Sequence, residues 1–114
     1  MKFNLIVGFI NPKITNEVIE TAKKAGATGD VVIPGKGSGM EQATFMGLPI
    51  QDKTDVVLFV TEEHCTPSIV KSISTECNIE GPGNGILLVM DIDKVVGLSK
   101  QIKKIRENLK TEQL

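Results

Sequence analysis

Strand-like segments that are apolar at successive positions, rather than at alternate ones, most constrain the fold of this chain. Three such segments lie at about 3–10, 55–61 and 85–90. Neighbouring side chains of a strand point to opposite faces, so a sheet with one wet face alternates apolar and polar residues. Here both faces of each predicted strand are apolar. One short terminal helix is too narrow to cover a four-stranded sheet, so we expect a homo-oligomer with the sheet faces turned inward.

Two amphipathic segments separate these strands and predict helices. The first begins at Thr15 or Asn16, as a capping residue, and stops at Gly26. The second begins at Thr66–Pro67, where a hydroxyl caps the helix and proline fits its first turn. Apolar residues recur near a 3.6-residue spacing in both, at Ile14, Val18, Ile19, Ala22 and Ala25, and at Ile69, Val70, Ile73 and Cys77.

A further strand at about 29–34 completes the order βαββαβ. This order predicts an α+β, ferredoxin-like fold: a four-stranded antiparallel sheet with two helices on one face. We expect a polar surface loop at 35–47, between the second and third strands. The predicted domain spans 1–98, and 99–114 is a charged segment expected to form a C-terminal amphipathic helix.

Composition excludes several classes of function. Basic and acidic residues nearly balance, at 13 against 14, which argues against a nucleic-acid binder. The chain has no Trp or Tyr and only four Phe, so aromatic base-stacking platforms are not expected. It has no apolar run of membrane-spanning length, and its two cysteines, Cys65 and Cys77, fit a reducing compartment. We therefore expect a cytoplasmic protein.

Two glycine-rich turns, at 35–39 (GKGSG) and 81–85 (GPGNG), lie at matched places in the two halves of the chain. Glycine allows positive φ and close backbone approach, so such turns can direct several N–H groups at one anion. They can equally be plain connections between strands. Neither has the spacing of a P-loop or of a dinucleotide-binding fingerprint. The favoured interpretation is a small-molecule sensor.

Five motifs follow one another between residues 3 and 98. They are KAGATGDVVI at 24–33, GKGSG at 35–39, GLPI at 47–50, EGPGNGI at 80–86 and DKVVGL at 93–98. Together they resemble the PII (nitrogen regulatory) signal-transduction superfamily, and especially its PII-like branch. The resemblance implies a non-catalytic, ferredoxin-like homotrimer that binds an adenine nucleotide between subunits. It also implies signalling to a target protein, such as a transporter or an enzyme, through a T-loop at 36–49.

The resemblance also implies the residues that contact the ligand, mostly through the backbone: Thr28, Gly29, Gly35, Lys36, Gly37, Gly81, Gly83 and Gly85. Several cations of true PII proteins are absent. Ile86 stands where a phosphate-binding lysine is expected, and Gly97 and Ser99 lie near the positions of two arginines. Each charged hydrogen bond contributes about 1.5–3 kcal/mol, so AMP or ADP is a better candidate ligand than ATP. Without a tyrosine, the uridylylation switch is absent too.

Two other functions remain open. A metal-responsive protein, similar in fold to the CutA family, would use His64, Cys65 or Glu41 as ligands. Glu62, Glu63, His64 and Cys65 together could suggest a metal site. His64 and Cys65 are adjacent in sequence, however, which is not a usual ligand spacing, so the favoured interpretation is a strand-to-helix turn with no metal. A small hydrolase or transferase is the third alternative, but the sequence shows no nucleophile with a partner base. Cys77 is predicted to be a core residue.

Overall fold

The computed structural model describes residues 2–36, 44–45, 48–49 and 53–97, and the predicted C-terminal helix lies outside these ranges. The main elements are β1 (Phe3–Ile10), α1 (Thr15–Lys24), β2 (Asp30–Lys36), β5 (Lys53–Glu62), α2 (Thr66–Glu76) and β6 (Gly85–Ile92). The short strands β3 (Thr44–Phe45) and β4 (Leu48–Pro49) pair with each other. This confirms the βαββαβ prediction for the main sheet.

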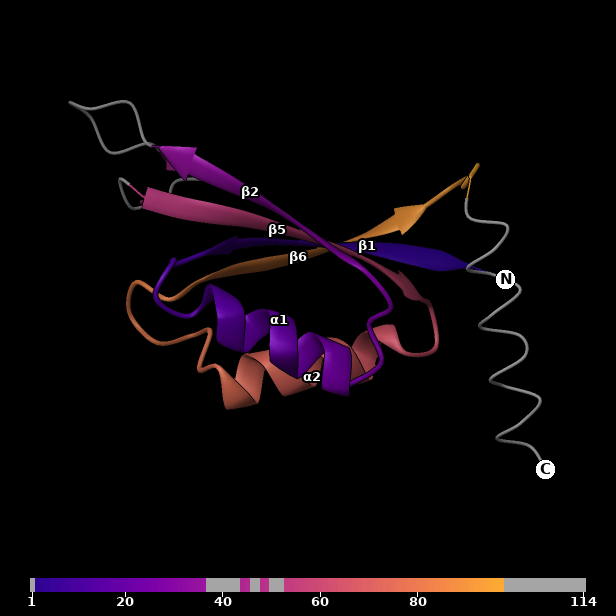
Figure 1. Cartoon of the computed structure of the whole chain (residues 1–114), viewed down its shortest axis with the longest axis horizontal. Helices are drawn as coiled ribbons and strands as arrows, with labels where there is room; N and C mark the ends of the chain where they lie inside the picture. Colours follow the sequence, from indigo (N-terminus) through magenta and orange to yellow (C-terminus); the bar gives the residue numbers. More distant parts are fainter. Residues whose placement is uncertain (1, 37–43, 46–47, 50–52, 98–114) are drawn as a thin grey trace.

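The sheet is antiparallel throughout, in the order β2-β5-β1-β6. Both helices lie against one of its faces (Figure 1). The core forms between that face and the helices, and its largest fully buried side chains are Phe59, Ile6, Ile10, Ile69, Ile73, Val18 and Val57. The apolar faces predicted for both helices are the faces that pack on the sheet.

The opposite face of the sheet is open and apolar. The strand register places Val31, Leu58, Val7 and Leu88 in one row across the four strands, and Ile33, Val56, Phe9 and Ile86 in another. Val31 and Ile33 are 56% and 49% exposed, and Met90 is 48% exposed. The prediction that both faces of the strands are apolar is therefore confirmed. Such a face is far larger than an isolated surface side chain and indicates an interaction surface.

Two local predictions were wrong. The 35–47 segment is not loop throughout, because Gly35 and Lys36 extend β2 and Thr44–Phe45 form β3. The helix caps are also different. The N-cap residues are Ile14 and Cys65, without side-chain caps, and the hydroxyls of Thr15 and Thr66 lie inside their helices.

Those two hydroxyls each lie near a carbonyl oxygen four residues earlier. Asn11 O lies 3.4 Å from the Thr15 hydroxyl, whose nearer acceptor is Asp55 Oδ2 at 2.7 Å. Glu62 O lies 3.1 Å from the Thr66 hydroxyl, whose nearer acceptor is Asn4 Oδ1 at 2.8 Å. Each threonine thus ties its helix to a strand of the sheet instead of capping free N–H groups. In the part of the chain that the structure describes, no helix is both long enough and apolar enough to cross a membrane.

Candidate functional site

The first group of predicted ligand-binding residues lies at the end of β2. Gly35 is the register partner of Thr54 and Lys36 that of Lys53. A Cβ atom on Gly35 would lie 2.7 Å from the carbonyl oxygen of Thr54, so close packing of β2 on β5 requires glycine here. The next predicted residue, Gly37, lies outside the described residues.

The second group is the turn at 78–85, which precedes β6. Its shape is fixed by internal hydrogen bonds: Gly81 N–H donates to Asn78 O over 2.9 Å, and the Asn84 side-chain amide donates to the same oxygen over 2.7 Å. Gly83 adopts a φ of +72°, which favours glycine. In this conformation the Gly81 amide is used within the turn and is not presented to a ligand.

Asn11 attaches this turn to the end of β1. Its backbone N–H donates to Asn84 O over 2.9 Å, and its side-chain amide donates to Gly83 O over 3.0 Å. Its side-chain oxygen accepts the N–H of Lys13 over 3.0 Å. In the structure, Asn11 holds the second glycine turn against the sheet.

The third group, Thr28 and Gly29, lies in the exposed link between α1 and β2. An ion pair spans this link, with Lys23 Nζ 3.6 Å from Asp30 Oδ1. The link is at the opposite end of the sheet from the first two groups, because Asp30 is in register with Phe59 whereas Pro34 is in register with Asp55.

The three groups therefore do not meet within one chain. Pro34, Asp55, Ile10 and Gly85 form one row across the sheet, which places the end of β2 and the start of β6 at the same end. β5 and β1 lie between them, so the two edges are about 14 Å apart at roughly 4.8 Å per strand. A single phosphate group cannot contact both.

The cysteines differ in their surroundings. Cys77 is buried, as predicted, and its Sγ lies 3.5 Å from Thr21 Oγ1. Burial raises the pKa of the Cys77 thiol, and the nearby Glu17 and Glu76 raise it further, so this thiol stays protonated at neutral pH. Cys65 is half-buried at the N-terminus of α2, and its metal-ligand candidate partner Glu41 lies outside the described residues.

Solved structures share this architecture. GlnK from B. subtilis superposes with a TM-score of 0.65 at 14% identity, over 87% of this chain and 92% of GlnK. The chain has the PII fold. A protein from Thermus thermophilus, described as a PII-like signaling protein, gives a TM-score of 0.59 at 16% identity, over 81% of this chain and 88% of that one. The apo form of CPII from Thiomonas intermedia, a nitrogen regulatory PII-like protein, gives 0.61 at 14% identity, over 81% and 90%.

No family model matches the sequence, and no curated protein matches it. The likeness is therefore one of fold. It agrees with the resemblance stated from the sequence motifs at the level of architecture, and the ligand-binding residues of this PII-fold chain stay predictions.

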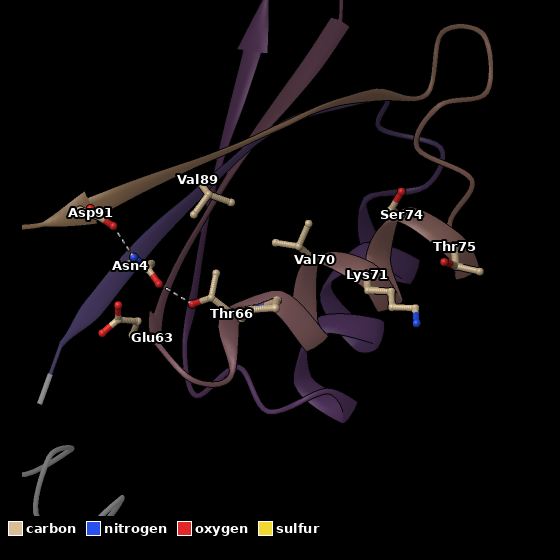
Figure 2. Close-up of a pocket in the computed structure, with 10 residues that line it drawn as sticks. Asn4, Glu63, Thr66, Val70, Lys71, Ser74, Thr75, Val89 and Asp91 are labelled. Carbon is tan, nitrogen blue, oxygen red and sulfur yellow. Dashed lines mark hydrogen bonds between the residues drawn. The ribbon is translucent and has the colours of Figure 1, made fainter.

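A groove between α2 and β6 was not predicted from the sequence. It has a volume of about 590 Å³, and Figure 2 shows Thr66, Val70 and Lys71 on its helix side and Val89 and Asp91 on its strand side. Asn4 lies at one end and donates to Asp91 Oδ1 over 2.9 Å. The sequence signal was present but weak, since Asn4 is the polar residue in an otherwise apolar strand.

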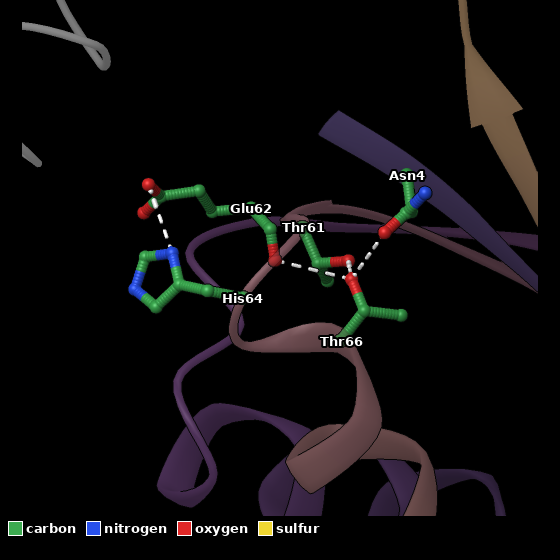
Figure 3. A network of polar contacts seen from close by, with 5 residues as sticks. All are labelled: Asn4, Thr61, Glu62, His64 and Thr66. Atoms are coloured by element: carbon green, nitrogen blue, oxygen red, sulfur yellow. Dashed lines mark hydrogen bonds and ion pairs between the residues drawn. The ribbon is translucent and has the colours of Figure 1, made fainter. Parts of the chain in front are cut away.

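A polar network beneath the groove was also missed. The Thr66 hydroxyl lies 2.7 Å from that of Thr61 and donates to Asn4 Oδ1 over 2.8 Å (Figure 3). All three residues are buried. The network fixes the first turn of α2 against β1 and β5, and so positions the turn at 62–65 that carries the half-buried Cys65.

Proposed function

We propose that this chain is a cytoplasmic, non-catalytic regulatory protein of the PII-like type. It assembles as a homotrimer, binds AMP or ADP between subunits in preference to ATP, and signals to a target protein through the segment at 36–49. It does not bind nucleic acid. The observation that carries this proposal is that the predicted binding residues divide between the two edges and the two ends of one sheet. A site that uses them needs residues from more than one chain.

The open face of the sheet supports assembly. Two complete rows of four aliphatic or aromatic residues cross it, and Val31, Ile33 and Met90 are about half exposed in the single chain. Burying apolar surface stabilises an assembly by about 25 cal/mol per Å². Among the described residues of a single chain nothing packs on this face, whereas a trimer with its sheets turned inward would cover it.

The charge at the end of β2 supports an anionic ligand. Lys36 and Lys53 are register partners on adjacent strands. Like charges directly opposite one another destabilise a strand pair, and an anion bound between them removes that repulsion. A phosphate group at this end of the sheet would therefore meet two lysine positions next to Gly35.

Isothermal titration calorimetry with AMP, ADP and ATP tests the proposal. We expect wild-type affinity on the order of micromolar or weaker, about 8 kcal/mol at most. Lys53→Gln should weaken binding by about tenfold, because a charged hydrogen bond contributes about 1.5–3 kcal/mol. Lys94→Gln changes another exposed lysine, two residues beyond the end of β6; it is the matched control and should bind as wild type does.

A second variant tests the glycine turn. Asparagine tolerates the left-handed conformation of Gly83, so Gly83→Asn keeps the backbone of the turn but adds a side chain that blocks close approach. We expect this variant to keep the wild-type assembly mass and to lose nucleotide binding. Nucleotide binding unchanged in both Gly83→Asn and Lys53→Gln would refute the site. If no adenine nucleotide binds the wild-type chain, the ligand class is wrong.

A further inference from the structure

We propose that Glu62, His64 and Cys65 form a site for a zinc-like divalent cation at the turn between β5 and α2. One ligand atom from each of the three side chains lies within 4.8 Å of the others. Carboxylate oxygen, imidazole nitrogen and thiolate sulfur are the usual ligands of Zn²⁺, at about 2.0–2.3 Å from the metal. Small side-chain rotations bring such a set into a tetrahedral arrangement.

The turn explains why adjacent residues can act together. The N–H of Cys65 donates to Glu62 O over 2.9 Å, which closes a four-residue turn. The end of β5 and the first turn of α2 then project the three side chains into one region, although His64 and Cys65 follow each other in the chain. The sequence-based prediction of no metal depended on their adjacency, and the closed turn removes that objection.

The ligand set is held before any cation arrives. His64 Nδ1 and Glu62 Oε1 are 3.0 Å apart (Figure 3), and the Glu62 side chain is only 13% exposed. The backbone around them is anchored, since Glu63 N–H donates to Lys2 O over 2.9 Å and Glu62 O lies 3.1 Å from the buried Thr66 hydroxyl. A cation bound between imidazole and carboxylate would replace the contact that they now make with each other.

Cys65 supplies the thiol of this set. Cys65 is the N-cap residue of α2, a helix of eleven residues. A thiol binds a metal ion as the thiolate, so on binding its proton would be released to solvent. Three protein ligands leave the fourth position to water, as in exchangeable zinc sites rather than closed structural ones.

This site lies at the opposite end of the sheet from Gly35 and the turn at 78–85, and at the same end as Thr28 and Gly29. Glu62 is at the end of β5, in register with Phe3, whereas Asp55 lies in the row that joins Pro34 to Gly85. Seven residues of extended strand separate Asp55 from Glu62, or about 23 Å. The cation would therefore be a second input to the protein, and either proposal can fail without the other.

Cobalt titration tests the site, because Co²⁺ bound to a thiolate absorbs in the near ultraviolet and tetrahedral Co²⁺ absorbs in the visible. We use the full chain, stripped of metal by a chelator and kept reduced. The chain has one histidine and two cysteines, so the imidazole ligand can only be His64 and the thiolate can only be Cys65 or Cys77. We expect saturation at one equivalent per chain and displacement of Co²⁺ by Zn²⁺.

Matched variants decide which residues bind. Cys65→Ser should abolish the thiolate band, and His64→Gln and Glu62→Gln should each weaken binding by at least about tenfold. Cys77→Ala and Glu63→Gln remove the other cysteine and the neighbouring exposed carboxylate, and both should titrate like wild type. Circular dichroism checks that each variant is folded. The proposal is overturned if wild type shows no thiolate band, if the band survives Cys65→Ser, or if Glu63→Gln weakens binding as much as Glu62→Gln.

Discussion

Replacing Thr66 by valine should destabilise the fold while leaving its shape unchanged. Valine has the same branched outline as threonine but no hydroxyl. The hydroxyl of Thr66 contacts Thr61 Oγ1 over 2.7 Å, Asn4 Oδ1 over 2.8 Å and Glu62 O over 3.1 Å. Thr66 is 5% exposed, so water does not replace these contacts readily.

The magnitude follows from the groups that Thr66→Val leaves behind. A buried polar group without its partner costs about 1–3 kcal/mol. Asn4 keeps its bond to Asp91, and the Thr61 hydroxyl can rotate, so we expect the low end for each and a total of about 2–3 kcal/mol. Thr66→Ser keeps the hydroxyl and loses one methyl group, at about 1 kcal/mol. The difference between the two variants isolates the network.

Urea denaturation followed by circular dichroism measures this difference. All variants are compared at one chain concentration, because assembly makes stability depend on concentration. Thr66→Val should lower the free energy of unfolding by about 2–3 kcal/mol, and Thr66→Ser by about 1 kcal/mol. If Thr66→Val is as stable as Thr66→Ser, the hydroxyl network contributes nothing and the reasoning is wrong.

Three further predictions concern the open sheet face, the buried thiol and the start of β6. Leu58→Lys places a charge between Val7 and Val31 on the open face. Burying this charge is unfavourable, so the variant should have a lower assembly mass in light scattering than wild type and an unchanged circular dichroism spectrum. An unchanged assembly mass would argue against this face as the interface. The pKa of Cys77 is higher in the folded state than in the unfolded state, where it is about 8.5. The contribution of Cys77 to stability is therefore complete below the unfolded-state pKa and is lost as pH rises through the folded-state pKa. The free energy of unfolding falls over this range by up to about 1.4 kcal/mol per pH unit. Cys77→Val should remove that part of the slope between pH 8 and pH 10, and an identical slope would contradict the assignment. Gly85→Ala should lower the free energy of unfolding in urea by at least about 2 kcal/mol, because Gly85 has a φ of +150° and an added Cβ would lie 2.5 Å from Phe9 O. An unfolding free energy equal to that of wild type would contradict this.

Much of the fold could be predicted because the spacing of apolar residues within a short segment indicates whether the segment is a helix or a strand. The apolar run of β1 predicted its bounds, and the stripe containing Val18 and Ala22 predicted which side of α1 packs on the sheet. Apolar residues at successive positions of β5 predicted that the sheet has a second apolar face, and the structure has this face on the side away from the helices. These signals depend on neighbours within a few residues.

The polar networks could not be predicted, because they depend on residues far apart in the sequence. Asn4 reaches Asp91 across 87 residues and Thr66 across 62. The helix caps were wrong for a related reason: Thr66 has better partners in β1 and β5 than its own helix offers, so tertiary contacts displaced the local capping rule. The meeting of Glu62 with Cys65 required the hydrogen bond that closes the turn, which spacing alone does not show.

Native mass spectrometry of the chain with and without AMP and ADP tests the central claim most directly. It reports assembly and ligand binding in one spectrum. The account predicts a species of three chains, each of 12.3 kDa, that gains up to one nucleotide for each interface between subunits. A chain that remains monomeric at micromolar concentration, or a trimer whose mass does not change with AMP, ADP or ATP, would contradict the account.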